Sequence, residues 1–274
     1  MMPSQPLEFP AIDPVAFSLF GLDIHWYGLA YVAAFFSALY YLNWQTTRYP
    51  GKPDKAMVDN LFVWGVLGVI LGGRLGYTLF YNPGYYLSHP VEIFHIWEGG
   101  MSYHGGLIGV VLAILLFARR EHISPYAIAD KLAPGVCIGL LFGRLANFIN
   151  GELYGRVTDV PWGMVFPGGG PLPRHPSQLY EALLEGVVLF VVLHFILRKR
   201  WRKGEVSGLF LFGYGVSRFG VEFVRQPDPL AHLQEGIFTV VSMGQLLSLP
   251  MIVIGAAMWW WSRRQEVVKT ARAS

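Results

Sequence analysis

Seven apolar runs dominate the chain, and each is long enough, or nearly so, to cross a bilayer as a helix. They cover residues 18–42, 59–81, 102–118, 132–150, 177–197, 206–224 and 240–261, with ends uncertain by several residues. A transmembrane helix needs about 20 apolar residues, and hydrocarbon requires every backbone polar group to be paired within the segment. The pattern therefore predicts an all-α, polytopic membrane protein with about seven transmembrane helices. The fourth run is short and rich in glycine, which leaves open a six-span alternative in which this run is re-entrant.

Composition agrees with this class, because 53% of the 274 residues are hydrophobic and only 14% are charged. No stretch has the balance of a soluble domain. We therefore expect residues 1–274 to form a single transmembrane domain. Residues 1–17 contain no Lys or Arg, so we expect no cleavable signal peptide. The single Cys137 excludes an intrachain disulfide and is expected to be a small packed side chain.

The basic residues predict the orientation of the chain in the membrane. If the N-terminus lies outside, the four inner segments hold most of the 21 Lys and Arg residues, and the outer segments hold only Arg156, Arg174 and Arg225. This asymmetry predicts an outer N-terminus and an inner C-terminus. The net charge of +3 then reflects topology, and we expect no binding of nucleic acid. The tryptophans at 259–261, followed by two arginines, are typical of an inner-interface anchor.

Two outer segments are long enough to form a small cap on the outer face. Residues 82–101 include PVEIFHIWEGG, whose polar and apolar positions suit a short helix on the membrane surface. Residues 151–176 contain FPGGGPLPRHP, which is too rich in Gly and Pro for a long helix. Glycines also recur every four residues, at 68, 72 and 76 and at 135, 139 and 143, a spacing that lets helices pack closely.

Charged residues inside the predicted spans gather at one depth. A charge at the bilayer centre costs roughly 2.5–3.5 kcal/mol on insertion scales, so Arg74, Arg144 and Arg218 need an explanation. At 1.5 Å per residue, Arg74 and Arg144 lie about 10 Å below the outer ends of their spans. Six spans place polar side chains in the same outer half, including His25, Tyr27, His104, Asn147, Gln178, Glu181, Glu185, Tyr214 and Glu222.

These residue types predict a positively charged pocket for an anionic phospholipid headgroup that enters sideways from the outer leaflet. Guanidinium groups bind phosphate with paired hydrogen bonds, and the third span begins at His104 and two glycines, where free backbone N–H groups attract anions. Plainer interpretations stay open. Arg74 and Arg218 can form structural ion pairs with Glu181, Glu185 or Glu222, and Asn147 and Asn150 can join helices by hydrogen bonds.

At these residues the chain resembles a known family. The stretch GRLANFINGELYGR at 143–156 is similar to the signature of the prolipoprotein diacylglyceryl transferases. Other stretches also resemble this family, so that the resemblance covers nearly the whole chain: HWYG at 25–28, GGRLGY at 72–77, WEGGMSYHGGLIG at 97–109, RHPSQLYE at 174–181 and GYGVSRFGVEFVRQPD at 213–228.

The resemblance implies an enzyme that transfers the diacylglyceryl group of phosphatidylglycerol to the lipobox cysteine thiol of a prolipoprotein signal peptide. The products are a thioether-linked lipid and glycerol 1-phosphate. It implies a multi-pass protein of the bacterial cytoplasmic (inner) membrane, with the active site toward the outer, periplasmic face. It implies no metal and no cofactor, and we expect a monomer. The family's important positions carry over as Tyr27, His104, Arg144, Asn147, Glu152, Gly155, Tyr214, Arg218, Glu222 and Arg225.

We hypothesise that Arg144 and Arg218 hold the phosphate and that His104 helps to deprotonate the thiol. The other positions are expected to bind or orient the lipid, and Glu152 is expected to brace the cap by an ion pair with Arg156. An anionic-lipid transporter or flippase is the main alternative, but no inverted repeat is visible. A non-enzymatic assembly factor needs no such cluster of charges. The last span of this chain has no Lys that could form a Schiff base with retinal, which argues against a retinal protein. The chain also has none of the motifs of an intramembrane protease.

Overall fold

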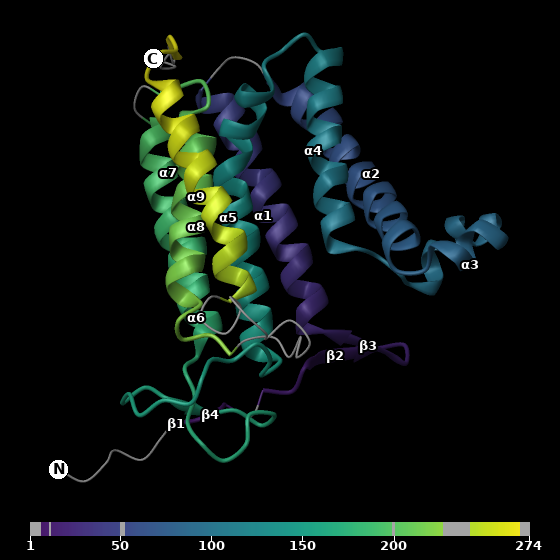
Figure 1. Cartoon of the computed structure of the whole chain (residues 1–274), viewed down its shortest axis with the longest axis vertical. Coiled ribbons are helices and arrows are strands. Elements are labelled where there is room, and N and C mark those ends of the chain that lie inside the picture. Colours follow the sequence, from purple (N-terminus) through teal and green to yellow (C-terminus); the bar gives the residue numbers. More distant parts are fainter. Residues whose placement is uncertain (1–6, 11, 50–52, 199–200, 227–241, 269–274) are drawn as a thin grey trace. The chain divides into compact units, whose positions relative to one another are not determined.

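The fold is mostly helical and divides into two compact units, which are described one at a time (Figure 1). The computed structural model describes residues 7–10, 12–49, 53–198, 201–226 and 242–268. The first unit comprises Met1–Leu42 and Asp130–Lys269, and the second comprises Asn43–Ala129 and Thr270–Ser274. The boundaries cut through two helices, α1 (Trp26–Arg48) and α5 (Pro125–Ile149), so each contributes a few residues to the second unit.

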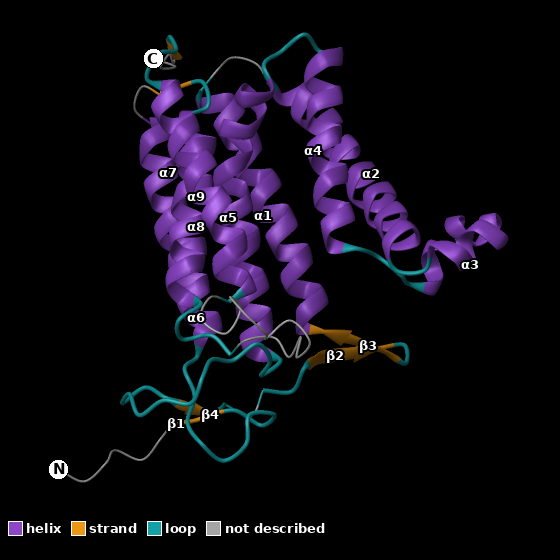
Figure 2. Ribbon diagram, in the orientation of Figure 1, coloured by secondary structure: helices purple, strands orange, loops and turns teal. Residues whose placement is uncertain are grey.

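The first unit is a bundle of long helices with short strands at their ends (Figures 1 and 2). Besides α1 and α5, its helical elements are α6 (Ser177–Glu181), the π-helix η3 (Ala182–Val188), α7 (Leu189–Arg198), α8 (Glu205–Val221) and α9 (Met243–Ser262). Helices α8 and α9 pack closely because Gly208 and Gly255 leave room between them. A Cβ on Gly208 would lie 2.8 Å from the backbone nitrogen of Trp259.

The predicted start of the first span at residue 18 is wrong, because residues 15–25 form a hairpin. Strand β2 (Val15–Leu19) pairs with β3 (Leu22–His25), and α1 begins only at Trp26. Phe20 and Gly21 both have positive φ, at 50° and 80°, which is the conformation of the tight two-residue turn that joins twisted strands. The fold is therefore mostly helical and not strictly all-α, because it also contains these short strands.

The fourth predicted span is one helix of 25 residues, α5, which extends further toward its N-terminus than the prediction. Its length and composition place it among the candidate membrane spans. A continuous helix of this length favours a full span over the re-entrant alternative. Cys137 is fully buried in this helix, as expected.

The fifth predicted span is interrupted by a π-helix that the sequence pattern did not predict. The seven residues of η3 lie between α6 and α7. Such wider turns are rare and occur often at functional sites. Gly186 in η3 lies against α5, where a Cβ would be 2.8 Å from the Cβ of Leu141. The wider turn and this glycine together bring η3 close to α5.

The strand pairs of the first unit connect segments that the topology prediction places on the same side. Strand β1 (Leu7–Glu8) pairs with β4 (Met164–Val165), so the N-terminal segment meets the segment after α5. Strand β5 (Trp201–Arg202) pairs with β6 (Val267–Val268), so the segment after α7 meets the chain after α9. Both pairings agree with the predicted alternation of outer and inner segments.

The second unit is built on two helices, α2 (Lys55–Phe80) and α4 (Tyr103–Arg120). They pack along the predicted glycine seam, since a Cβ on Gly76 would lie 2.7 Å from the Cα of Gly105. Asp54 and Ser102 cap the two helices by accepting hydrogen bonds from backbone N–H groups in their first turns.

The segment that joins α2 to α4 was predicted as a short surface helix and consists of shorter pieces. These are α3 (Pro83–Ser88) and two 3₁₀ helices, η1 (Pro90–Phe94) and η2 (Ile96–Glu98). Large apolar side chains stay exposed on them, among them Leu87 at 83% and Phe94 at 75%.

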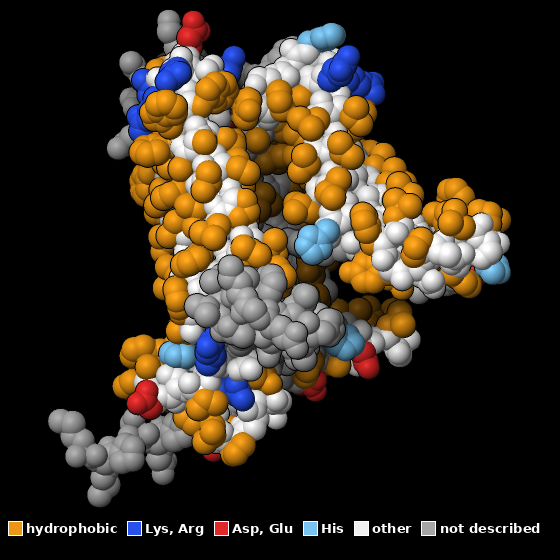
Figure 3. All heavy atoms as spheres, in the orientation of Figure 1, with side chains coloured by type: hydrophobic (Ala, Val, Ile, Leu, Met, Phe, Trp, Pro, Cys, Tyr) orange, Lys and Arg blue, Asp and Glu red, His pale blue; other side chains and the backbone are white. Residues whose placement is uncertain are grey.

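The chain is a polytopic membrane protein. Within the described residues, four helices are long and apolar enough to cross a membrane: Lys55–Phe80, Pro125–Ile149, Ser177–Arg198 and Met243–Ser262. Apolar side chains cover the helices in Figure 3, and Lys and Arg lie near helix ends. At the end of α9, Arg263 and Arg264 lie over the rings of Trp259 and Trp260, at 4.9 and 4.5 Å from the ring centroids, as the predicted interface anchor requires.

Candidate functional site

A cluster of charged side chains lies at one end of the first unit, where α5, α6, η3 and α8 meet. Arginine and glutamate side chains from segments far apart in the sequence face one another here. We call it the arginine–glutamate cluster, and its members are Arg144, Glu181, Glu185, Arg218, Glu222 and Arg225.

Glu181 lies at the centre of this cluster. Its Oε2 lies 2.6 Å from Nη2 of Arg144, and its Oε1 lies 3.6 Å from Nη1 of Arg218 and 3.9 Å from Nε of Arg225. Glu185, one turn further along, has its Oε2 4.0 Å from the same Arg144 nitrogen. One carboxylate therefore faces three guanidinium groups, and a second supports Arg144.

The α8 side of the cluster follows the predicted stripe of polar residues. Nη2 of Arg218 lies 3.1 Å from Oε2 of Glu222, one helical turn away, and Nη1 of Arg225 lies 4.0 Å from the same oxygen. Gly244, in the first turn of α9, allows this approach, since a Cβ there would lie 2.6 Å from Oε2 of Glu222. The positive end of the α9 dipole is thus close to a carboxylate, which is a favourable arrangement.

The pocket is not lined by positive charge alone, because three arginines face three glutamates, and Arg218 forms the ion pairs that the sequence left open. Burial is nevertheless unequal. The Glu181 and Glu185 side chains are 1% and 0% exposed, whereas those of Arg144 and Arg218 are 18% and 15% exposed. The carboxylates lie behind the guanidinium groups, so the accessible part of the cluster is cationic.

Arg144 has the most available guanidinium group of the cluster. Both of its ion pairs use the single nitrogen Nη2. Over the described ranges of the chain, its Nε and Nη1 make no hydrogen bond or ion pair. The N–H groups of Nε and Nη1 can therefore each donate to an oxygen of a phosphate.

The end of α5 is closed by side chains that hold the following loop. Nδ2 of Asn147 donates a 2.9 Å hydrogen bond to Oε1 of Glu152, and Asn150 donates to the same oxygen at 3.4 Å. Nε2 of Gln178 donates to the backbone oxygen of Glu152. The predicted ion pair between Glu152 and Arg156 is wrong, since Nε of Arg156 donates instead to the backbone oxygen of Arg225 at 3.0 Å.

Gly155 is required where three backbone segments meet. It forms a β-bridge with Arg225, and its N–H donates to the backbone oxygen of His175 at 2.8 Å. A Cβ there would lie 2.5 Å from the backbone oxygen of Val224. Gly155 thus holds the backbone of Arg225, a member of the cluster, in place. Burial lowers the pKa of His175, and the nearby Asp159 opposes this shift.

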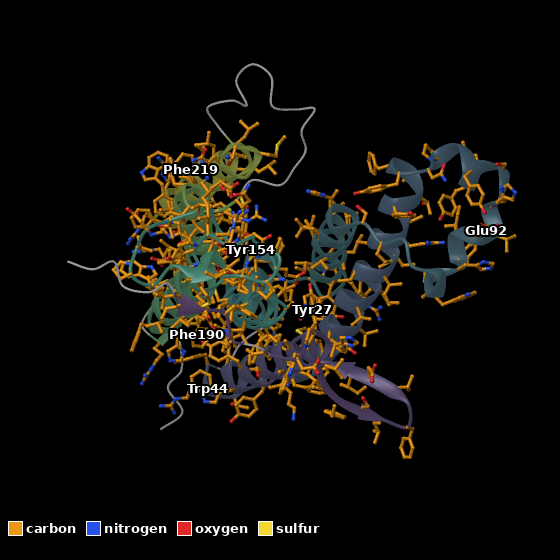
Figure 4. The ribbon with its side chains drawn as sticks, turned by 90° about the horizontal axis from the view of Figure 1, so that it is seen from below. Tyr27, Trp44, Glu92, Tyr154, Phe190 and Phe219 are labelled. Atoms are coloured by element: carbon orange, nitrogen blue, oxygen red, sulfur yellow. The ribbon has the colours of Figure 1, made fainter. Side chains whose placement is uncertain are left out.

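The two predicted tyrosines lie close to the cluster. Tyr27 lies near the start of α1 (Figure 4). Its hydroxyl is 3.2 Å from that of Tyr31 and within electrostatic range of Glu152 and Arg144. Tyr214 lies one turn before Arg218 on α8 and interacts with it electrostatically. The first unit therefore brings together every predicted site residue except His104.

Arg74, in the second unit, has a role different from the predicted one. Its guanidinium donates to four backbone oxygens of the segment after α2, namely those of Glu92 at 2.5 Å, Ile93 at 2.8 Å, Gly99 at 2.6 Å and Gly100 at 3.3 Å. It also lies 5.3 Å from the ring centroid of Tyr86. Figure 4 shows Glu92 among these short helices. Arg74 holds this segment together, and these backbone oxygens occupy the guanidinium group that was predicted to face a phosphate.

His104 lies in the first turn of α4, where its side chain is exposed. The preceding Ser102 donates its backbone N–H to the oxygen of Gly73 at 2.8 Å, which fixes the start of α4 on α2. His104 and the arginine–glutamate cluster belong to different units. That His104 acts at this cluster stays a prediction.

Comparison with known proteins identifies the family. The family model described as prolipoprotein diacylglyceryl transferase matches residues 14–261. The chain belongs to this family. Three relatives named phosphatidylglycerol–prolipoprotein diacylglyceryl transferase match along nearly their whole length. The one from Idiomarina loihiensis is 54% identical over 96% of this chain and 98% of its own, that from Aliivibrio salmonicida 52% over 96% and 92%, and that from Vibrio cholerae 50% over 96% and 96%.

Family membership makes the protein a membrane transferase of lipoprotein biosynthesis. The predicted resemblance is thereby confirmed, and the flippase and assembly-factor alternatives have no support from these relatives. What the sequence did not reveal is the central place of Glu181. The pattern placed Gln178, Glu181 and Glu185 on one helix face, and all three are fully buried, but spacing alone did not predict which charges they meet.

Proposed function

We propose that this transferase moves the diacylglyceryl group of phosphatidylglycerol onto the cysteine thiol of a prolipoprotein, and that the arginine–glutamate cluster holds the lipid phosphate. The observation that carries this proposal is that Nε and Nη1 of the part-exposed Arg144 have no partner among the described residues. The names of the relatives supply the two substrates. The signal peptide's lipobox cysteine, and the release of glycerol 1-phosphate, follow from the family resemblance.

The chemistry explains why the reaction needs cationic groups. The thiolate sulfur forms a bond to the third glycerol carbon of the diacylglyceryl group, and the bond from that carbon to the phosphate oxygen breaks. The electron pair leaves with the oxygen, so glycerol 1-phosphate gains one negative charge. The thiol proton must go to a base. Donors arranged in advance around the developing charge lower the barrier to this step.

Arg144 and Arg218 are positioned to stabilise this developing charge. Both are part-exposed, and both are held from behind by buried carboxylates. Arg144 offers its Nε and Nη1 to the phosphate oxygens. A guanidinium group suits this role because its planar fork matches two oxygens and it stays protonated.

The remaining members of the site shape the pocket around these two arginines. Asn147 and Glu152 close the end of α5 by their mutual hydrogen bond, and Gly155 sets the backbone of Arg225. We assign Tyr27 and Tyr214 to orientation of the lipid headgroup or glycerol backbone. Glu222 holds Arg218 at 3.1 Å.

His104 is proposed as the base that takes the thiol proton. A free thiol has a pKa near 8.5 and is mostly protonated at neutral pH, and a positioned base typically contributes about 10²–10⁴-fold in rate.

We also propose how the chain lies in its membrane. Seven spans cross the bacterial inner membrane: the four long apolar helices together with α1, α4 and α8. The N-terminus lies outside, the C-terminus lies inside, and segments 82–101 and 151–176 cap the outer, periplasmic face. The strand pairs β1–β4 and β5–β6 support this alternation. The enzyme acts as a monomer, without a metal or cofactor.

A direct assay tests the function. Purified protein is mixed with phosphatidylglycerol and a lipobox peptide, and the thioether-linked product and released glycerol 1-phosphate are both measured. We expect the two products in equal amounts. A peptide with Cys replaced by Ser serves as the control and should give neither product. Lipid movement across a vesicle membrane without either product would instead support a flippase.

A further inference from the structure

We propose that Glu181 is a positioning residue that holds three arginines of the site in one working arrangement. This inference rests on the proposed function of the arginine–glutamate cluster. Its Oε2 contacts Arg144 at 2.6 Å, while its Oε1 faces Arg218 at 3.6 Å and Arg225 at 3.9 Å. The three arginines come from α5, from α8 and from the segment after α8, so one carboxylate connects three separate parts of the fold.

The carboxylate of Glu181 is itself held in place by its own helix. Gln178 and Ser177 lie one turn before it on α6, and they donate hydrogen bonds to the backbone oxygens of Glu152 and Leu153, the latter at 3.0 Å. The side chains of Ser177, Gln178 and Glu181 are all at most 1% exposed. The start of α6 is therefore fixed to the loop that follows α5, which helps to hold Glu181 near Arg144.

A second carboxylate, that of Glu185 in η3, reaches the same arginine. Gly186 in η3 lies against Leu141 of α5, and Glu185 lies just before this contact. Both carboxylates approach Nη2 of Arg144. Because they share one nitrogen, the rest of the guanidinium group stays available, which is the property that phosphate binding needs.

Charge makes Glu181 more than a packing residue. Without its negative charge, three guanidinium groups would face two carboxylates, and the site would carry an excess positive charge in a poorly solvated place. Like charges then repel, and the arginines lose their fixed orientation. Such a site attracts an anionic lipid more strongly but stabilises the leaving phosphate less well, because misplacement by about 1 Å can cost on the order of 10²-fold in rate.

Two variants and a matched control separate this role from a purely structural one. Glu181→Gln keeps the shape and removes the charge, whereas Glu181→Asp keeps the charge but is shorter. Glu205→Gln is the control. Glu205 is another buried carboxylate, 8% exposed, and it pairs with Arg263 at 3.9 Å. It lies in the first turn of α8, at the other end of this helix from the cluster. Binding is measured with short-chain phosphatidylglycerol in detergent micelles, with short-chain phosphatidylcholine, a zwitterion without net charge, as the comparison.

For Glu181→Gln we expect phosphatidylglycerol to bind several-fold more tightly, and turnover per bound lipid to fall about 10²-fold by loss of orientation. For Glu181→Asp we expect slower turnover without tighter binding. Glu205→Gln should match the wild type in both. A structural role alone lowers the bound fraction and leaves turnover per bound lipid unchanged.

Wild-type turnover per bound lipid in Glu181→Asp, or in a folded Glu181→Gln, overturns the inference. If Glu181→Gln does not fold, Glu181→Asp decides alone. If the wild-type protein itself transfers no diacylglyceryl group, the proposed function fails instead, and the binding measurements still report whether Glu181 governs the affinity for the anionic lipid.

Discussion

Two identical tripeptides in this chain place an arginine in very different surroundings. Gly73-Arg74-Leu75 lies on α2 and Gly143-Arg144-Leu145 lies on α5, and each begins a similar distance before the end of its helix. Arg74 is 5% exposed and donates to four backbone oxygens. Arg144 faces two carboxylates through one nitrogen, and its Nε and Nη1 have no partner in the part of the chain that the structure describes.

The difference lies in what the rest of the chain brings to each arginine. Backbone oxygens of one connecting segment surround the Arg74 guanidinium, so its hydrogen-bonding capacity is almost filled by the protein. Side chains from α6 and η3 approach Arg144 from one side only. The first arrangement builds a scaffold, and the second leaves room for a ligand. The same local sequence therefore supports either role, and tertiary contacts decide between them.

The largest effect should come from removing the available arginine. We expect Arg144→Ala to lower turnover by about 10³-fold or more, because loss of one preorganised donor to a developing oxyanion typically costs on the order of 10²–10³ and the charge is lost too. Arg144→Lys should recover only part of the rate, since an ammonium group cannot bind two oxygens in a fixed plane. Transfer of radiolabelled lipid to a lipobox peptide measures both. Normal turnover in folded Arg144→Ala would contradict the assignment.

The second-largest effect is expected at His104, which lies in the second unit, like Arg74. We expect His104→Asn to lower turnover by about 10²-fold, the lower end of the range for positioned base catalysis, with lipid binding unchanged. The loss should shrink as pH rises toward about 8.5, where the thiol ionises without help. A pH–rate profile of wild type and variant measures this. Identical profiles would remove His104 from the role of base.

Arg74 should affect stability more than chemistry. We expect Arg74→Lys to lower the free energy of unfolding by about 2 kcal/mol, because an ammonium group cannot reach four separate backbone oxygens and hydrogen bonds to a charged group contribute roughly 1.5–3 kcal/mol each. Thermal unfolding in detergent gives the change. The affinity for phosphatidylglycerol should stay at the wild-type level, and a loss of lipid affinity in the folded variant would assign Arg74 to the binding site after all.

Sequence reasoning reached the helices and the composition of the site, but it did not reach the partners within the site. The apolar runs identified the helices because burial in lipid leaves a strong pattern. The turn at Phe20 and Gly21 was missed because a hairpin next to an apolar helix continues the same run. The π-helix leaves no periodic signal in seven residues. The contacts of Arg74 were unpredictable for a physical reason: backbone oxygens are present at every residue, so no side-chain pattern marks them.

The glycine seams extend the comparison of the two units to packing, and here the smallest effect is expected. A Cβ on Gly72 would lie 2.7 Å from the Cα of Gly109, whereas nothing lies within 4 Å of a Cβ on Gly139. Gly72→Ala should therefore destabilise by about 1 kcal/mol, since overpacking costs roughly 1–3 kcal/mol and the better helix propensity of Ala returns up to about 1 kcal/mol. Gly139→Ala gains only the propensity and should stabilise slightly. Thermal midpoints of the two variants in the same detergent should move in opposite directions. If both thermal midpoints moved in the same direction, the two glycine seams would pack alike, and the difference between them described here would be contradicted.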